Sequence, residues 1–202
     1  MGTNVKLRTL VATVGGMLLV LALLVTLPLG SSARAAAAAT PEPPVPLGAA
    51  WSYAVLAGST ITNTGSTVIT GDLGLSPGTA VTGFPPGTVS GTQNVANPAA
   101  VQAQSDLTTA YDNAAGQTPA TTVAGDLGGQ TLTPGVYNSA AGTFGMTGTL
   151  TLDAQGDANA VFIFQMASTL TTASASQVNL INGAQSCNVF WQVGSSATLG
   201  TN

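Results

Sequence analysis

A series of short β-like runs, separated by Gly, Pro, Asn and Asp, constrains the fold of this chain more than any other feature. Each run has five to seven residues, which is an ordinary strand length. In GTLTLD, residues 148–153, Leu150 and Leu152 are expected to face a core while Thr149 and Thr151 face water. These patterns predict a mainly β domain. The runs are STITNT, STVIT, GTLTLD, AVFIFQM, STLTTAS, QVNLI and NVFWQV.

Residues 97–117 break this pattern and predict a single helix laid against the β structure. Asn97 is suited to cap the helix, Pro98 to occupy its first position and Gly116 to end it. The apolar residues fall on one stripe at helical spacing, which we interpret as a packing face. They are Ala103, Leu107, Ala110, Tyr111 and Ala114.

Residues 1–39 have the layout of a secretory signal peptide, with a short basic start, a long apolar stretch and a run of small residues. Cleavage is expected after Ala35 or within the alanine run up to Ala39. An uncleaved membrane anchor is the alternative, because the apolar stretch from Val11 to Leu29 is close to the length that spans a bilayer. The following TPEPPVPLG, residues 40–48, is rich in proline and predicts an extended linker.

Charge is distributed very unevenly along the chain. The only basic residues are Lys6, Arg8 and Arg34, there is no His, and all seven acidic residues follow position 41. A product cleaved near residue 39 would therefore have a formal charge of −7 and no cation to neutralise phosphate, so we predict that nucleic acid is not a partner. The missing His and Lys are also the usual acid–base groups near neutral pH, so we predict no enzymatic activity.

The remaining candidates for chemistry are better explained as structural residues. Asp153 and Asp157 flank a loop, DAQGD, that lacks the spacing of an EF-hand, so we predict a polar turn. Asp72 and Asp126 lie in two Gly-Asp-Leu-Gly segments, where they are expected to form corners of the same kind and to bond backbone N–H groups. The single cysteine, Cys187, is predicted to be a small buried side chain. We predict neither a metal site nor a cofactor.

Two further alternatives are a carboxylate-only enzyme and a calcium site. A polysaccharide-cleaving enzyme that uses only carboxylates would need two of them to converge on a groove. The loop DAQGD is rich in oxygen and could bind calcium weakly, but it lacks the twelve-residue spacing and the terminal Glu of an EF-hand. No recognisable sequence pattern supports either the enzyme or the calcium site.

Threonine recurs at every second position in several of the runs. Threonine suits an exposed strand face, which is sufficient to explain one such run. In a parallel solenoid, however, outward threonines would form a flat grid spaced about 4.8 Å between strands and about 6.7 Å along a strand. Such a grid of methyl and hydroxyl groups can order water. The repeats are Thr60/Thr62/Thr64, Thr131/Thr133, Thr147/Thr149/Thr151 and Thr169/Thr171.

Several longer segments resemble the secreted ice-binding protein family of bacteria, fungi and algae. They are AVLAGSTITNTGSTVITGDLGLSPG (residues 54–78), AGDLGGQTLTPGVY, DANAVFIFQMASTLTT and INGAQSCNVFWQVGSSATLGT (residues 181–201). The resemblance implies a right-handed, triangular, discontinuous parallel β-helix with one long α-helix packed alongside. It also implies binding to ice and its ordered water through a flat Thr/Ser/Ala-rich face, without cofactor or catalysis.

We therefore predict a secreted, monomeric ice-binding (antifreeze) protein that inhibits ice recrystallisation and has no membrane contact after cleavage. Thr147, Thr149 and Thr151 are predicted to form one outward row, and Thr169 and Thr171 to lie on a neighbouring strand. The family pattern continues beyond SSATLGT, so residues 49–202 are predicted to be an ice-binding-like domain that is incomplete at its C-terminal end. A secreted adhesive or structural module without ice activity is the alternative.

Overall fold

The computed structural model describes residues 12–14, 17–19 and 42–201, which belong to two separate units. In the first unit, β1 (Ala12–Val14) pairs antiparallel with β2 (Met17–Leu19). Most of the predicted signal peptide, including both candidate cleavage sites at Ala35 and Ala39, lies outside the described residues. All further description concerns residues 42–201.

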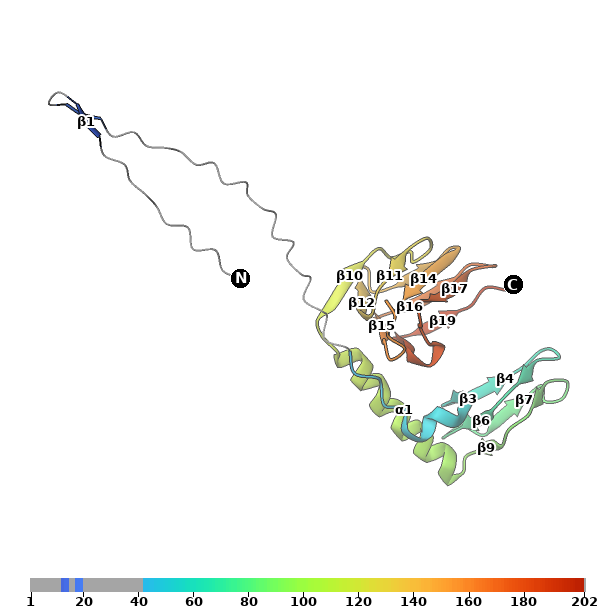
Figure 1. Ribbon diagram of the computed structural model, residues 1–202. Coiled ribbons are helices and arrows are strands. Elements are labelled where there is room, and N and C mark those ends of the chain that lie inside the picture. Colours follow the sequence, from blue (N-terminus) through green and yellow to red (C-terminus); the bar gives the residue numbers. More distant parts are fainter. Residues whose placement is uncertain (1–11, 15–16, 20–41, 202) are drawn as a thin grey trace. The chain divides into compact units, whose positions relative to one another are not determined.

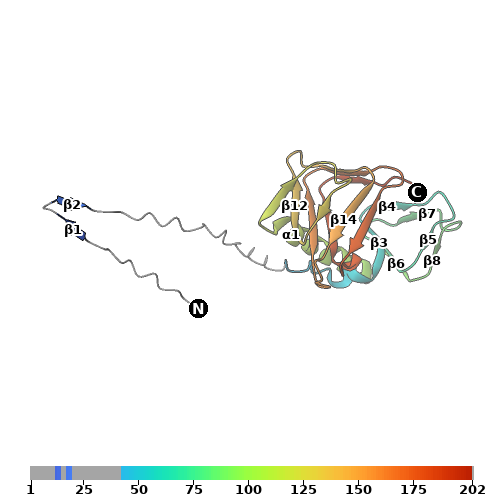
Figure 2. The ribbon, with the colours of Figure 1, turned by 45° about the horizontal axis from the view of Figure 1, so that its top comes forward.

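The C-terminal part of the second unit is a three-sided stack of parallel strands (Figures 1 and 2). Each turn of the chain adds one strand to each of three sheets. The helix-side sheet contains β10 (Ala120–Val123), β12 (Gly135–Ser139), β15 (Phe162–Met166) and β18 (Val189–Val193). The second sheet contains β13 (Phe144–Met146), β16 (Thr169–Thr172) and β19 (Ser196–Thr198). The third sheet contains β11 (Thr131–Leu132), β14 (Thr149–Asp153) and β17 (Gln177–Ile181).

The N-terminal part of this unit forms a second, smaller stack with the same parallel pairing. Among the described residues no strand pairing joins the two stacks, so the solenoid is discontinuous. This topology confirms the predicted mainly β, parallel β-helix architecture. The smaller stack contains β3 (Tyr53–Ala57), β6 (Asp72–Leu75) and β9 (Gln93–Val95), then β4 (Thr60–Thr62) with β7 (Ala80–Thr82), and β5 (Val68–Ile69) with β8 (Thr88–Val89).

Inward-facing apolar rows hold successive coils of the larger stack in register. Tyr137 pairs with Phe164 and Phe164 pairs with Trp191, so an aromatic row runs through three successive coils. The rings of Phe164 and Trp191 stack with centroids 4.2 Å apart, and those of Tyr137 and Phe164 with centroids 5.6 Å apart. Stacked aromatic side chains bury large areas and add a directional preference of about 0.5–1.5 kcal/mol per pair. Each coil is therefore aligned with the next by its own interior side chains.

The single α-helix, α1 (Pro98–Gly116), lies along one side of both stacks and contacts β3, β6, β9, β15 and β18 (Figure 1). As predicted, Pro98 begins the helix and the Asn97 side chain caps it by accepting the N–H of Ala100 at 3.0 Å. Neither α1 nor any short helix of the described chain has the length and apolar content needed to cross a membrane.

Small residues allow α1 to approach the sheets closely. Ala103, Ala110 and Ala114 of the predicted packing stripe are buried, as is the neighbouring Ala100, whereas Leu107 is half-buried. Tyr111 departs from the prediction because 39% of its surface is exposed, so it lies at the border of the buried face. At the helix end, the Gln165 side chain donates to the carbonyls of Ala114 and Gln117 at 2.8 and 2.9 Å and satisfies acceptors that the helix leaves open.

The proline-rich segment differs from the predicted linker. Val45 is only 7% exposed and packs in the same apolar cluster as Ala110, Ala114 and Ile163. The carbonyl of Pro43 accepts a bond from the Gln117 side chain at 3.2 Å. The chain then turns through η1 (Gly48–Ser52), next to α1. Residues 42–47 thus cover part of the helix, because the segment contains apolar side chains that composition alone does not assign to a core.

The inward row that joins β14 and β17 provides a stability test. Leu150 is fully buried, whereas its register partner Val178 is 37% exposed. Leu150→Ala is expected to lower the free energy of unfolding by about 2–5 kcal/mol, because it removes buried contacts and leaves a cavity. Val178→Ala, in the same row, should cost clearly less. Denaturant unfolding of both variants measures the difference, and equal losses would contradict this assignment of the core.

Candidate functional site

The outer surface of the second sheet is a regular array of small side chains, which we call the Thr face. Phe144 and Leu170 point inward and are 1% and 6% exposed, so the alternating positions point outward. The register aligns the outward residues in rows across the strands. The Thr face is defined by Thr169 with Ser196 in one row and by Gly145, Thr171 and Thr198 in the next.

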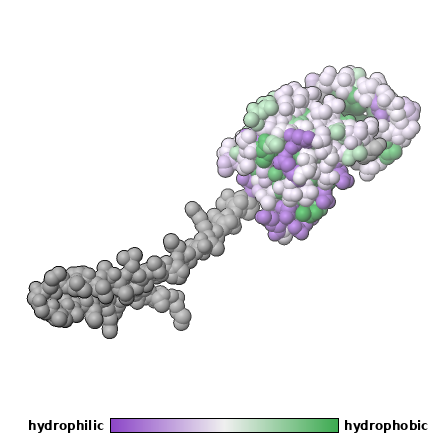
Figure 3. Space-filling view, turned by 90° about the horizontal axis from the view of Figure 1, so that it is seen from above, coloured by the Kyte–Doolittle hydropathy of each residue, from purple (hydrophilic) through white to green (hydrophobic). Residues whose placement is uncertain are grey.

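The Thr face is uncharged and its side chains have few conformers. Strands β13, β16 and β19 contain no ionisable residue. Threonine is branched at Cβ and therefore restricted at χ1, whereas Lys, Glu or Gln would have several mobile torsions. The surface in Figure 3 is correspondingly pale over most of its described area, which indicates intermediate hydropathy with only small strongly polar or apolar patches. Such a surface is suited to geometric recognition rather than to charge pairing.

One carboxylate, that of Asp126, lies at the edge of the Thr face. An isolated parallel bridge pairs Asp126 with Gly145 and so places it at the end of the row that contains Thr171 and Thr198. Its carboxylate accepts the N–H of Gly128 at 2.9 Å, the N–H of Thr147 at 3.0 Å and the hydroxyl of Thr147. These hydrogen bonds hold the pKa of Asp126 below its ordinary value because they stabilise the charged carboxylate. The bond from the Thr147 hydroxyl has the largest effect, and the two N–H groups add to it.

The predicted row on β14 is outward-facing but does not adjoin Thr169 and Thr171. Thr149 and Thr151 alternate with the fully buried Leu150 and Leu152, as predicted. The predicted adjacency is wrong, because β14 pairs with β11 and β17 whereas β16 pairs with β13 and β19. The chain turns a corner between β13 and β14.

Thr147 is the residue that this corner separates from the rest of its predicted row. Gly148 has φ +89°, a conformation that favours glycine, and β14 begins only at Thr149. Thr147 directly follows β13 and bonds to Asp126, so it belongs to the edge of the Thr face. The three threonines of the predicted row are thus divided between two sheets.

The outer surface of the third sheet is less uniform than the Thr face. Thr151 pairs with Thr131 on one side and Asn179 on the other. Thr149 pairs with Gln177, whose side-chain amide donates to the Thr149 hydroxyl at 3.0 Å. Asp153 and Ile181 form the next pair, so this surface mixes long amides, a carboxylate and an aliphatic side chain. It lacks the repetition of small groups that characterises the Thr face.

The smaller stack carries a similar array on β4 and β7. Thr60 pairs with Ala80 and Thr62 with Thr82, and all four side chains are exposed while Ile61 points inward. These strands follow the helix-contacting strands β3 and β6 in the chain, just as β16 and β19 follow β15 and β18.

Two residues of the Thr face, Ser196 and Thr198, escaped the sequence prediction. Their segment reads Ser-Ala-Thr, which does not repeat threonine at alternate positions. The available signal was spacing: Ser196 follows the start of β18 by seven residues, as Thr169 follows the start of β15. That comparison requires knowing that β15 and β18 are equivalent strands.

The residues with chemical potential have structural surroundings. Asp153 and Asp157 accept the N–H groups of Gln155 and Asn159, each at 2.8 Å, and form the predicted polar turn. In the described ranges there is no group of three His, Cys, Asp or Glu residues placed to hold a metal ion. Cys187 is exposed in the short helix η2 (Ser186–Asn188), so the prediction that it is buried is wrong.

The two Gly-Asp-Leu-Gly segments are not equivalent corners. Asp72 begins strand β6 and accepts the N–H of Thr92 from the next coil at 2.8 Å. Asp126 lies in an isolated bridge and accepts bonds from a turn and from Thr147. Both carboxylates bond backbone N–H groups, as predicted, but the chain paths differ because one segment continues a strand while the other turns after it.

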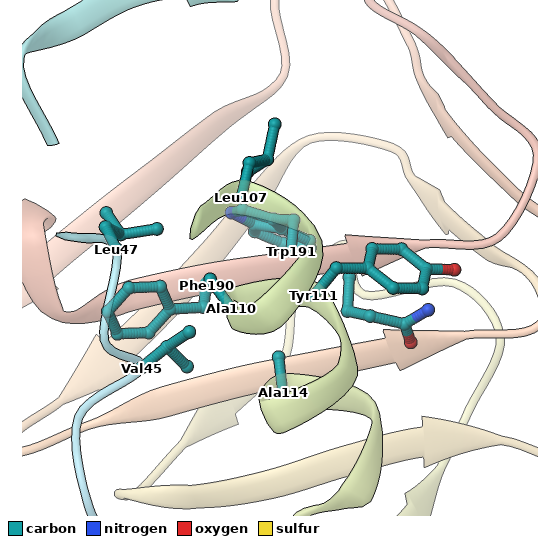
Figure 4. Close-up of a pocket in the computed structure, with 9 residues that line it drawn as sticks. Val45, Leu47, Leu107, Ala110, Tyr111, Ala114, Phe190 and Trp191 are labelled. Carbon is teal, nitrogen blue, oxygen red and sulfur yellow. The ribbon is translucent and has the colours of Figure 1, made fainter. Parts of the chain in front are cut away.

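A small apolar pocket of about 100 Å³ lies where the segment of residues 42–47, α1 and β18 meet (Figure 4). Val45 and Leu47 line it from the segment, Leu107 and Tyr111 from α1, and Phe190 from β18. No carboxylate lines this pocket, so it does not supply the acid pair that carbohydrate cleavage requires.

Comparison with known proteins relates the chain to ice-binding proteins. The family model described as ice-binding-like matches residues 55–202. An ice-binding protein of Nostoc sp. (strain HG1) is 54% identical over 156 residues, which cover 77% of this chain. The chain spans 57% of the length of that relative, which is less than two thirds of it.

Solved structures agree with this relationship. The crystal structure of an ice binding protein from an Antarctic biological consortium is 49% identical, with a TM-score of 0.76, over 80% of this chain and 73% of that chain. An ice-binding protein from the Antarctic ascomycete Antarctomyces psychrotrophicus is 43% identical, with a TM-score of 0.75, over 78% of each chain. At these identities and scores, the similarity extends across both stacks and α1.

The corner beside Thr147 yields a prediction about glycine. A Cβ at Gly128 would lie 1.7 Å from the Thr147 carbonyl oxygen, whereas a Cβ at Gly145 would meet its nearest atoms only at 3.8 Å. Gly128→Ala is therefore expected to cost about 1–3 kcal/mol, because the backbone must shift. Gly145→Ala is the matched control and should change stability little. Thermal unfolding compares them, and an unaffected Gly128→Ala variant would contradict the close approach.

Proposed function

Since the chain belongs to the ice-binding-like family, we propose that it adsorbs to ice through the Thr face. The single observation that carries the proposal is the in-register array of Thr169, Thr171, Ser196 and Thr198 on one exposed sheet surface. The array on β4 and β7 contributes a second set of contacts of the same kind. Adsorption of this type would make the protein an antifreeze and an inhibitor of ice recrystallisation.

The mechanism follows from the spacing of the sheet. Neighbouring strands lie about 4.8 Å apart and outward residues on one strand about 6.7 Å apart, so hydroxyl and methyl groups repeat in two dimensions. Hydroxyl groups donate to and accept from water, while the methyl groups between them restrict where water can lie. Water held in this array bridges the protein to the ice surface, much as ordered water bridges other polar interfaces.

Rigidity makes the array effective as a template for water. Threonine loses little side-chain freedom on binding because its χ1 angle is already restricted. The buried Phe144 and Leu170 hold β13 and β16 from beneath, so the outward positions are fixed by the core. A lysine or glutamate surface would instead have to order long side chains and displace their own hydration water, at a cost in entropy.

We also propose that the mature protein is secreted and acts as a monomer without a cofactor. The support is the signal-peptide layout of residues 1–39 and the absence of any basic residue after Arg34. An uncharged array does not require a second chain to complete it.

Substitution at the centre of the array tests the proposal. Thr171→Tyr should remove most of the thermal hysteresis, because the large ring prevents a flat approach of ice, while stability changes by only about 0.5 kcal/mol at this exposed position. Thr151→Tyr, on the third sheet, is the matched control and should retain hysteresis. Loss of activity in the Thr151 variant, with full activity in the Thr171 variant, would transfer the site to the third sheet.

The export proposal has a separate test. When the full chain is expressed with its first 39 residues, N-terminal sequencing of protein from the medium is expected to begin after Ala35 or within the run up to Ala39. Recovery of protein with an intact residue 1 in the membrane fraction would contradict secretion and favour an anchor.

A further inference from the structure

Asp126 is an unexpected residue at the edge of an array that is otherwise uncharged. It extends the row of Gly145, Thr171 and Thr198, where an exposed carboxylate would normally keep its own hydration water. Its two oxygens instead accept three hydrogen bonds, two from N–H groups and one from the Thr147 hydroxyl. A carboxylate has about four acceptor sites, so most of its capacity is used within the protein.

We propose that Asp126 is a positioning residue that fixes Thr147 and the adjacent turn at the edge of the Thr face. This inference rests on the proposed function and extends it to a residue that does not itself contact ice. With the carboxylate in place, the Thr147 hydroxyl donates to Asp126, which fixes the rotamer of Thr147 and therefore the position of its methyl group. The bond from Gly128 draws the turn against the same residue.

Backbone hydrogen bonds that do not involve the Asp126 carboxylate hold this segment in the fold. Leu127 donates its N–H to the Gly145 carbonyl at 2.9 Å, and Gly145 donates its own to the Gly125 carbonyl at 2.7 Å. The Leu127 side chain is fully buried in the main core cluster. The segment is therefore anchored by its backbone and by Leu127, and the carboxylate is left to orient the surface groups.

A second carboxylate offers a matched control at another corner. Asp153 also accepts local bonds, from the Gln155 N–H and the Asn182 side chain, each at 2.8 Å. It belongs to β14 of the third sheet, and within the described residues its side chain bonds to Gln155 and Asn182 rather than to the Thr face. Removing it deletes a comparable set of surface hydrogen bonds without altering Thr147.

The test compares thermal hysteresis and melting temperature for Asp126→Ala, Asp126→Asn and Asp153→Ala in the full chain. Asp126→Ala is expected to lose a large part of the hysteresis at a temperature where circular dichroism shows it fully folded. Asp126→Asn should restore much of it, because the amide oxygen can still accept N–H bonds and the amide can bond to the Thr147 oxygen. Asp153→Ala should behave like the wild type.

A double-mutant cycle with Thr147→Val distinguishes positioning from general stabilisation. Thr147→Val keeps the residue's shape and its backbone N–H but removes the hydroxyl, so adding Asp126→Ala should then reduce hysteresis little further. Additive losses, or equal losses in the Asp126 and Asp153 variants, would overturn the role of Asp126. If Thr171→Tyr lowers the thermal hysteresis but Asp126→Ala does not, this inference alone is overturned. If the wild type itself shows no hysteresis, the proposed function is overturned as well.

Discussion

The stacking of inward side chains in parallel register is the constraint on which the remaining structure depends. Tyr137, Phe164 and Trp191 continue one row through three coils, and Phe144 with Leu170 form another. Because side chains alternate between the two sides of a strand, fixing the inward set also fixes every outward residue, and a shift of one position would exchange them. The Thr face is thus the outer side of the same pairing that builds the core.

The helix determines which side of the solenoid remains available. Its buried alanines pack close to the helix-side sheet, whose outer residues Val136 and Ile163 are thereby withdrawn from solvent. Val45, from the proline-rich segment, joins the same cluster. The second and third sheets are left to present outward residues, and the second does so with small groups in regular rows while the third combines Gln177, Asp153 and Ile181. Because α1 covers the helix-side sheet, a candidate binding surface of the larger stack can lie only on the second or the third sheet.

Charge has a local role in this molecule. With no basic residue after Arg34, the carboxylates cannot form ion pairs within residues 42–201, and several instead accept backbone N–H groups at turns. Such bonds satisfy the acid without requiring a cation. Strands β13, β16 and β19 contain no ionisable residue, so the Thr face itself is suited to recognise ordered water by shape and spacing.

The sequence by itself determined the local features of this protein: the strand runs, the limits of α1, the polar turn at Asp153 and Asp157, and the alternation of Leu150 and Leu152 with their threonine neighbours. These follow from propensities and periodicities that act over a few residues. Only the tertiary structure decided that Thr171 lies beside Thr198 while Thr151 lies beside Asn179, and that Val45 is buried. Strand partners such as Phe164 and Trp191 are 27 residues apart, and what repeats over that interval is the inward or outward direction of side chains rather than their identity. Corners such as Gly148 then assign consecutive threonines to different sheets, because the direction of the chain after a turn depends on which neighbouring coil it meets.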